Sequence, residues 1–178
     1  MVAAGCLPTC IRDNKLYFLF GQESPVEMSA KGWSDFAGSM EKGEKNIYNT
    51  AIREMAEETS GFLGGPTEIN KLIKNNGGFM KCTFDNSGSP YHTHIFRMDH
   101  DEKLITYYNA NHKYLYDNLN HELLKSTKVF EKIKLEWFTI DMMKKRRKDF
   151  RGFYKTIVDQ LILNSDIIEK FTRSKKKI

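Results

Sequence analysis

Three glutamates, Glu54, Glu57 and Glu58, are spaced by three and four residues, so a helix would place their carboxylates on one face. Three like charges on one face repel one another unless a cation lies between them. Carboxylate oxygens are ligands that Mg²⁺ and Mn²⁺ prefer, and these ions also bind water and substrate phosphates. Arg53 lies four residues before Glu57 and can pair with it or with Glu44, which would hold the carboxylate face in place. The spacing therefore indicates a site for Mg²⁺ or Mn²⁺.

A solvated helix that is rich in glutamate would be the simpler explanation of the Glu-x-x-Glu-Glu pattern by itself. That explanation leaves out the surrounding residues, since a Gly-containing loop ends at Gly43 and Glu44 and Gly61 follows the pattern. The expected helix spans about residues 46–59, and we expect the carboxylates to lie opposite its apolar stripe. The stripe consists of Ile52, Met55, Ala56 and Thr59.

The whole segment resembles the Nudix box, which reads Gly, five residues, Glu, seven residues, then Arg-Glu-apolar-x-Glu-Glu-x-Gly-apolar. Two departures occur, because eight residues separate Glu44 from Arg53 and Ser60 is an extra residue before Gly61. Both fall in a loop or at a helix end, where one-residue insertions are tolerated. The residues that match the box are Gly38, Glu44, Arg53, Glu54, Met55, Glu57, Glu58, Gly61 and Phe62.

The resemblance implies a Nudix hydrolase, an enzyme that uses Mg²⁺ or Mn²⁺ to cut a pyrophosphate linkage in a nucleotide-containing substrate. It also implies the Nudix fold, an α/β/α sandwich around a mixed sheet. Glu57 and Glu58 would be the main metal ligands, and the carbonyl of Gly38 is a further candidate. Glu54 would be another ligand or the base that activates water, with Arg53 beside it in the catalytic group.

Many members of that family recruit one more carboxylate from a loop shortly before a Trp-containing strand. Glu131 lies six residues before Trp137 and is similar in position, whereas Glu122 and Glu136 are weaker candidates. The alternative for Glu131 is ordinary surface charge. We therefore expect Glu54 or Glu131 to act as the base.

The substrate is less clearly encoded. Trp33, Phe20 and Phe79 could stack on a nucleotide base, although core packing is the favoured explanation for each of them. We expect a nucleoside triphosphate, ordinary or oxidised, as the substrate. Basic blocks at residues 144–148 and 173–177 favour RNA, which makes hydrolysis of the mRNA 5′ cap (decapping) the alternative. A non-catalytic module that binds nucleotide or RNA is a third hypothesis, against which the carboxylate cluster argues.

The order of elements that would position these residues is strand, strand, helix, three strands, helix. The expected strands span residues 3–11, 15–21, 79–84, 91–98 and 133–140, and the last helix spans about residues 149–163. Residues 103–125, rich in Tyr and Asn, form an expected insertion with helical periodicity, and residues 172–178 a basic tail. This order predicts an α/β or α+β sandwich.

The length of 178 residues, with 40% hydrophobic residues, suits a single domain. No apolar run approaches 18 residues and no secretory signal precedes the first strand, so no membrane partner is expected. Three cysteines without paired spacing fit a reducing compartment, which indicates the cytoplasm, or the host cytoplasm for a viral protein. The sequence does not determine the oligomeric state, and a homodimer is one of the possibilities.

Overall fold

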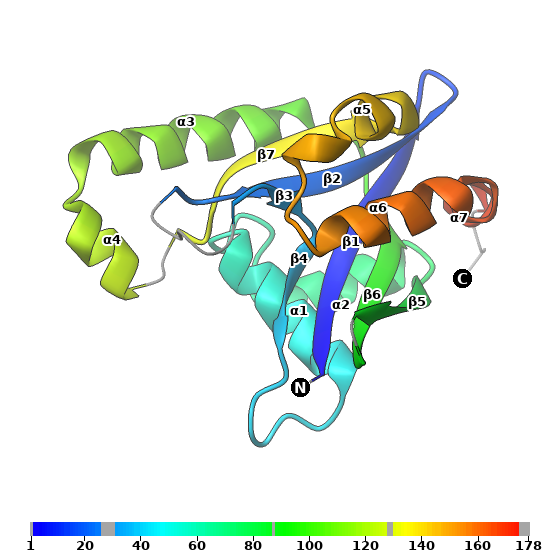
Figure 1. Cartoon of the computed structure of the whole chain (residues 1–178), viewed down its shortest axis with the longest axis horizontal. Coiled ribbons are helices and arrows are strands. Elements are labelled where there is room, and N and C mark those ends of the chain that lie inside the picture. The colour runs from blue at the N-terminus through cyan, green and yellow to red at the C-terminus, as the bar shows by residue number, and fades with distance from the viewer. Residues whose placement is uncertain (1, 26–30, 87, 128–129, 175–178) are drawn as a thin grey trace.

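A mixed seven-stranded sheet forms the centre of the computed structural model, which describes residues 2–25, 31–86, 88–127 and 130–174 (Figure 1). The strands are β1 (Ala3–Arg12), β2 (Lys15–Glu23), β3 (Trp33–Ser34), β4 (Phe36–Ser39), β5 (Phe79–Asn86), β6 (Ser89–Arg97) and β7 (Lys132–Thr139). The main path of the sheet is β3-β2-β1-β6-β5; β4 pairs with β1, and β7 pairs with β2. β1 and β6 pair in parallel, and the other pairs are antiparallel.

Helices cover both faces of this sheet and bury two separate apolar clusters. One cluster joins the sheet to α1 (Ile47–Glu58), α2 (Pro66–Asn75) and α3 (Glu102–Asn118), and α4 (His121–Thr127) follows α3. The other joins the sheet to α5 (Ile140–Lys145), α6 (Tyr154–Leu163) and α7 (Ser165–Arg173), with the 3₁₀ helix η1 (Arg147–Asp149) between α5 and α6. The expected α/β/α sandwich is confirmed.

β2 contributes side chains to both apolar clusters. Side chains alternate between the two faces of a strand, so Phe18 and Phe20 enter the second cluster whereas Leu19 enters the first. The hairpin between β1 and β2 turns at Asp13 and Asn14, which have φ values of 47° and 58°. Two consecutive residues with positive φ are typical of a type I′ turn, and Asn and Asp tolerate that conformation.

The helix that carries the glutamates begins where the sequence predicts. The side chain of Asn46 caps it by accepting a hydrogen bond from the backbone N–H of Asn49 at 3.0 Å. At the other end Ser60 and Gly61 have φ values of 51° and 71°, and the N–H of Gly61 bonds the carbonyl of Ala56. The extra residue before Gly61 therefore lengthens the helix-ending turn and leaves the helix intact.

Three α-helices, α2, α5 and α7, and the short strands β3 and β4 are absent from the sequence prediction. α2 is short and mostly polar, although Pro66 at its start is a typical helix signal. α7 extends to Arg173, so the expected tail begins inside a helix, and residues 175–178 lie outside the described residues. The segment expected as an insertion forms α3 and α4, which confirms its helical periodicity; its status as an insertion stays a prediction. None of the described helices is both long and apolar enough to cross a membrane.

Candidate functional site

The carboxylate helix is held against the sheet by β4. β4 pairs with the first half of β1, with Ala3 opposite Ser39 and Cys6 opposite Phe36. α1 packs on this corner through the buried side chains of Ala51 and Met55. The short chain between β4 and α1 therefore approaches the same face of the helix that bears the glutamates.

Glu44 shapes this connecting loop. Its carboxylate accepts hydrogen bonds from the N–H of Glu41 and from the hydroxyl of Thr50, both at 2.7 Å. The extra residue between Glu44 and Arg53 does not separate them, since the Arg53 Nε donates to Glu44 at 3.0 Å. In this structure Glu44 thus closes the loop onto the helix.

Arg53 connects three carboxylates. Besides Glu44, it contacts Glu54 through Nη2 at 2.7 Å and Glu57 through Nη1 at 2.8 Å. Its Nη2 also donates to the carbonyl of Ser39, at 3.1 Å, which ties the helix to the end of β4. The planar guanidinium can serve all these acceptors at once because its five N–H groups point in fixed directions. The predicted pairing of Arg53 with Glu57 and Glu44 is confirmed.

Glu54 and Gly38 lie in direct contact. A Cβ atom at position 38 would overlap with the Glu54 carboxylate, so only glycine allows the backbone to approach this closely. Burial raises the pKa of Glu54 above its ordinary value, an effect that the nearby Arg53 partly offsets. A carboxyl group with a raised pKa is better suited to accept a proton than an exposed one.

Glu58 lies deeper, in a buried ionic cluster. Its Oε2 accepts a hydrogen bond from the N–H of Ala37 at 2.8 Å, and its Oε1 lies 3.3 Å from the ammonium of Lys132. The same ammonium lies 2.5 Å from Glu23, which Arg151 contacts at 2.9 Å. Burial disfavours the charged form of Lys132, yet the flanking carboxylates of Glu58 and Glu23 raise its pKa above the ordinary value. The cluster therefore holds two positive and two negative side chains.

The spacing places all three glutamates opposite the apolar stripe, but Glu54 and Glu58 do not face solvent there. Both are buried, whereas the side chain of Glu57 is 58% exposed. The physical reason is the neighbouring structure: β4 covers one side of the helix, and the hydroxyl of Tyr108 in α3 donates to the Glu58 carbonyl at 3.0 Å. Backbone and ionic partners compensate for the loss of water around these carboxylates.

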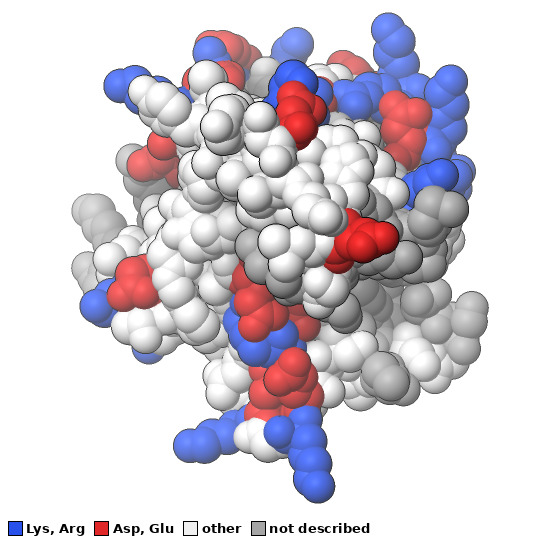
Figure 2. Space-filling view, turned by 90° about the vertical axis from the view of Figure 1, so that its left-hand side faces the viewer, with Lys and Arg blue, Asp and Glu red and all other residues white. Residues whose placement is uncertain are grey.

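An open cleft of about 790 Å³ brings most of the predicted catalytic and metal-binding residues together. Glu131 borders it together with Glu54, and its role as a fourth carboxylate of the site stays a prediction. Glu58 does not border the cleft and lies behind Ala37. Figure 2 shows acidic and basic side chains side by side in one compact group in the lower half of the face that it presents. The cleft is lined by Ala37, Gly38, Ser39, Met40, Glu41, Arg53, Glu54, Ala56, Glu57, Ser60 and Glu131.

The three aromatic residues expected to stack on a base do not border this cleft. Phe20 and Trp33 are buried in the second apolar cluster, where both pack edge-on against Phe138. Phe79 is partly exposed at the start of β5 and stacks on Tyr48 with 4.8 Å between ring centroids. Stacking of Phe20, Trp33 or Phe79 on a substrate base stays a prediction, and their positions away from the cleft do not support it.

The weaker acidic candidates also lie elsewhere. Glu136 pairs with Arg146 at 2.6 Å, and Glu122 is exposed in the first turn of α4. In the first basic block, Arg147 pairs with Asp159, whereas the lysines of residues 144–148 are exposed. The second basic block falls mostly on residues outside the described chain.

The donor set fits a hard divalent cation in chemistry. Glu54, Glu57, Glu131 and the Gly38 backbone supply oxygen atoms around one cleft. As the side chains stand, no three His, Cys, Asp or Glu residues of the described chain converge closely enough to hold a metal ion. Arg53 occupies the carboxylates of Glu54 and Glu57 instead. The residues needed for a metal site therefore lie around one cleft, and the Arg53 side chain pairs with two of their carboxylates, those of Glu54 and Glu57.

Sequence reasoning missed the buried cluster of Lys132, Glu23, Ser34 and Arg151. Lys132 donates to the Ser34 hydroxyl at 2.7 Å, and that hydroxyl donates to Glu23 at 3.0 Å. A single lysine at the start of a strand gives no sign that it is buried, since lysine is among the residues most often exposed. Its position directly after Glu131 is the one available signal.

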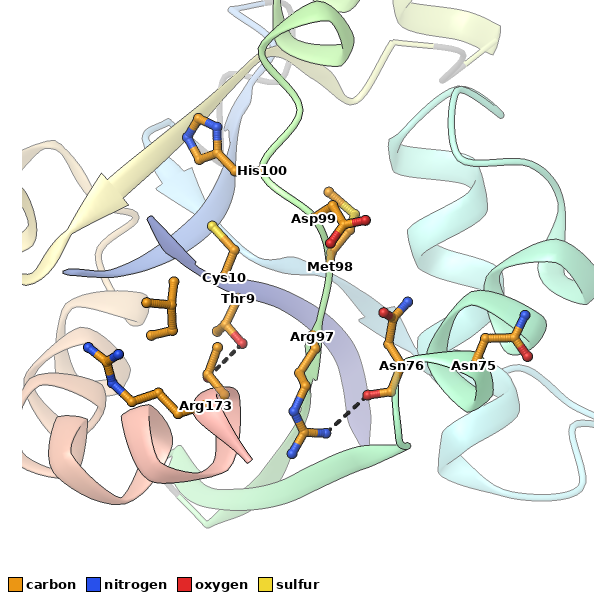
Figure 3. A pocket seen from close by; sticks show the side chains of 11 residues that line it. Thr9, Cys10, Asn75, Asn76, Arg97, Met98, Asp99, His100 and Arg173 are labelled. Atoms are coloured by element: carbon orange, nitrogen blue, oxygen red, sulfur yellow. Dashed lines mark hydrogen bonds between the residues drawn. The ribbon is translucent and has the colours of Figure 1, made fainter. Parts of the chain in front are cut away.

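A second pocket, of about 560 Å³, lies at the far ends of β1 and β6, and it shares no described lining residue with the cleft (Figure 3). Arg97 borders it and donates to the carbonyls of Asn76, at 3.1 Å, and Phe171. These carbonyls belong to the C-terminal ends of α2 and α7, where a positive charge is favourable. The hydroxyls of Thr9 in β1 and Thr172 in α7 form a further hydrogen bond of 3.0 Å. These contacts give Arg97 a structural role that ties α7 to the sheet.

Comparisons with known proteins agree with this architecture. A family described as NUDIX domain matches residues 1–161. Among solved structures, a C. elegans Ap4A hydrolase binary complex has a TM-score of 0.53 and 19% identity, over 95% of this chain and 99% of that one. The NUDIX domain of Shewanella oneidensis NrtR complexed with ADP ribose has a TM-score of 0.53 and 14% identity, over 97% and 88% of the two chains.

A third similar structure is a bifunctional NMN adenylyltransferase/ADP ribose pyrophosphatase from Francisella tularensis, complexed with AMP and a Mn ion. Its TM-score is 0.56 at 17% identity, over 92% of this chain and 41% of that one. Identities this low support a shared fold and nothing more specific. A search among curated protein sequences finds no match.

Proposed function

The chain belongs to the NUDIX domain family and is a hydrolase of nucleoside diphosphate derivatives, and we propose that its substrate is a nucleoside triphosphate, ordinary or oxidised, cut with Mg²⁺ or Mn²⁺. One observation carries this proposal. The cleft brings Glu54, Glu57 and Glu131 together beside the Gly38 backbone, and Arg53 fixes two of these carboxylates. Oxygen ligands around an open cleft suit a metal–polyphosphate substrate.

Following the family resemblance, Glu57, Glu58 and the Gly38 carbonyl would hold the metal ion, with Glu54 or Glu131 as a further ligand. Glu58 does not border the cleft in this structure, so it would have to turn toward the cleft to bind the ion. When bound, the ion would offset the charge of the phosphates and favour attack by water. Water attacks phosphorus, the bond from phosphorus to the bridging oxygen breaks, and the proton of the water passes to a carboxylate. Glu54 is one candidate base, because burial raises its pKa; Glu131 on the same cleft is the other.

Arg53 acts through the carboxylates that it contacts. It keeps Glu54 and Glu57 on the cleft and joins them to the Glu44 loop, so their positions are fixed before substrate arrives. Groups fixed in advance avoid the cost of reorganisation during the reaction.

The decisive experiment is a substrate panel measured with Mg²⁺ and with Mn²⁺. It contains dGTP, 8-oxo-dGTP, ADP-ribose, a diadenosine polyphosphate and capped RNA, with phosphate or nucleotide release as the readout. We expect turnover of dGTP or 8-oxo-dGTP to exceed that of the other substrates and to stop in EDTA. Faster turnover of another substrate would overturn the proposed substrate, and turnover that persists in EDTA would overturn the metal requirement.

Cap hydrolysis is the second candidate function. Lys144, Lys145 and Lys148 are exposed on α5 and η1, and such a cluster of positive charge favours RNA. Release of a capped nucleotide from RNA that falls steeply with added salt would favour this alternative. A module that only binds nucleotide is disfavoured, because a binding role alone does not require buried carboxylates at the cleft.

A further inference from the structure

One ammonium group is shared by two buried carboxylates at the back of the cleft. The Nζ atom of Lys132 lies 2.5 Å from Glu23 and 3.3 Å from Glu58, and its side chain is completely shielded from solvent. Glu23 and Glu58 are themselves almost fully buried. A lysine in such a place must keep a carboxylate partner, because an unpaired buried charge is strongly unfavourable.

Basic and acidic side chains are equal in number within the ion pairs of this cluster. Lys132 and Arg151 supply two positive charges, and Glu23 and Glu58 supply two negative ones. A divalent cation on Glu58 would add two positive charges a few ångströms from Lys132. At such separations inside a protein the Coulomb energy between charges is large. Lys132 and the metal ion would therefore compete for the same carboxylate.

The geometry provides the ammonium with a second acceptor. Glu23 is already the closer partner, and the Ser34 hydroxyl accepts another hydrogen bond from Lys132 at 2.7 Å. Lys132 can therefore stay paired when Glu58 turns to a metal ion. In this structure the Ala37 N–H donates to the other oxygen of Glu58 at 2.8 Å, so each oxygen of this carboxylate has a partner on the protein.

We propose that Lys132 and Glu23 are positioning residues that set the metal affinity of the site through Glu58. Lys132 holds Glu58 in the metal-free protein and weakens metal binding by competition, whereas Glu23 takes over the ammonium when the metal ion binds. This inference rests on the proposed function, in which Glu58 is a metal ligand.

The two residues are expected to shift metal affinity in opposite directions. Lys132→Met removes the competitor, so the dissociation constant for Mn²⁺ falls by about tenfold. Glu23→Gln leaves Glu58 as the one carboxylate beside Lys132, so that constant rises by about tenfold. A general loss of stability cannot produce opposite shifts. Lys134→Met is the matched control, because Lys134 lies on the same strand, is half exposed and contacts Glu136 at 3.8 Å.

The experiment is calorimetric titration of the full chain with Mn²⁺ in the absence of nucleotide, accompanied by thermal unfolding with and without Mn²⁺. For Lys132→Met we expect a lower melting temperature without the ion and a larger rise on adding it. Lys134→Met should match the wild type in both measurements. If Lys132→Met does not fold, Glu23→Gln decides the matter alone: unchanged or tighter Mn²⁺ binding overturns the proposal.

A failure of this inference can be told apart from a failure of the proposed function. If the wild type does not bind Mn²⁺, or if Glu58→Gln leaves its affinity unchanged, Glu58 is not a ligand and the proposed metal site is wrong. If Glu58→Gln weakens binding while Lys132→Met and Glu23→Gln shift it in the same direction or not at all, the metal site stands and the competition is refuted.

Discussion

The backbone of Gly38 lies so close to the carboxylate of Glu54 that any side chain at position 38 would overlap with the carboxylate oxygens. Gly38→Ala should therefore displace Glu54 from the cleft and from Arg53. Since a displacement of about 1 Å near reacting groups can cost about a hundredfold in rate, we expect kcat to fall by roughly that factor. Steady-state kinetics with the preferred nucleotide measures this effect.

Gly152→Ala is the control for this substitution, because a Cβ at position 152 would meet no atom within 4 Å. It should retain wild-type kcat. Equal activity of the two variants would show that the close approach of Gly38 to Glu54 has no role in turnover.

Glu57 offers the cleanest test of a metal ligand, because its side chain is 58% exposed and pairs with Arg53 alone among the described contacts. An exposed ion pair contributes less than about 1 kcal/mol, so Glu57→Gln should leave the free energy of unfolding nearly unchanged. Turnover with Mg²⁺ should fall at least about a hundredfold, because a ligand charge is lost. Glu122→Gln, which neutralises an exposed glutamate outside the cleft, should be fully active. Near-normal turnover by Glu57→Gln would remove Glu57 from the ligand set.

The residues on the glutamate helix could be predicted because they occupy one continuous segment. Glu54, Glu57 and Glu58 share a helical face through their spacing, and Arg53 reaches Glu57 one turn away. The position of Glu131 at the cleft required the family resemblance as well. Lys132 and Glu23 could not be paired from the sequence, since 109 residues separate them and their contact depends on the pairing of β7 with β2.

The main elements of the sheet were predictable for a similar reason. β1 and β2 are largely apolar runs, and β6 begins after a turn that contains Gly88; such local patterns identify strands. Burial of Glu54 and Glu58 was not predictable, because it results from β4 and α3 packing over the helix. The aromatic residues illustrate the same limit, since Phe20 and Trp33 are required by the core beneath α6. Local sequence pattern therefore identifies the candidate catalytic and metal-binding residues, whereas tertiary packing determines which of their side chains reach the cleft.

Arg53 holds Glu44, Glu54 and Glu57 with one guanidinium. Arg53→Lys keeps the charge but loses the planar fork, so a lysine cannot bond all three carboxylates in this arrangement. We expect kcat to fall by about tenfold or more while the KM for nucleotide changes less, because Arg53 positions catalytic groups. The comparison variant is Arg147→Lys, which breaks a similar double hydrogen bond to Asp159 on the surface. An equal loss of kcat in both variants would contradict this role for Arg53.

Asp35 should make the stability of the protein depend on pH. It is fully buried, and it accepts hydrogen bonds from the hydroxyls of Tyr91 and of Thr93, the latter at 3.0 Å. Burial raises the pKa of Asp35 from 3.8 to about 6, although these hydroxyls and the charge of Lys132 oppose the shift. Because the folded protein holds this proton more tightly than the unfolded chain, the stabilisation is complete below about pH 4. It is lost as the pH rises through about 6, by about 3 kcal/mol.

Asp35→Asn keeps the shape and the hydrogen-bonding capacity of the protonated carboxyl group, so it should remove this contribution. The difference in unfolding free energy, variant minus wild type, should therefore rise by about 2 kcal/mol between pH 4 and pH 7. Urea unfolding of both proteins in EDTA, at a series of pH values, measures the difference directly. Asp117→Asn, at an exposed position of α3, should show no comparable trend. A difference for Asp35→Asn that stays constant across this range would mean that Asp35 is charged in the folded protein even at pH 4, held so by Tyr91, Thr93 and Lys132.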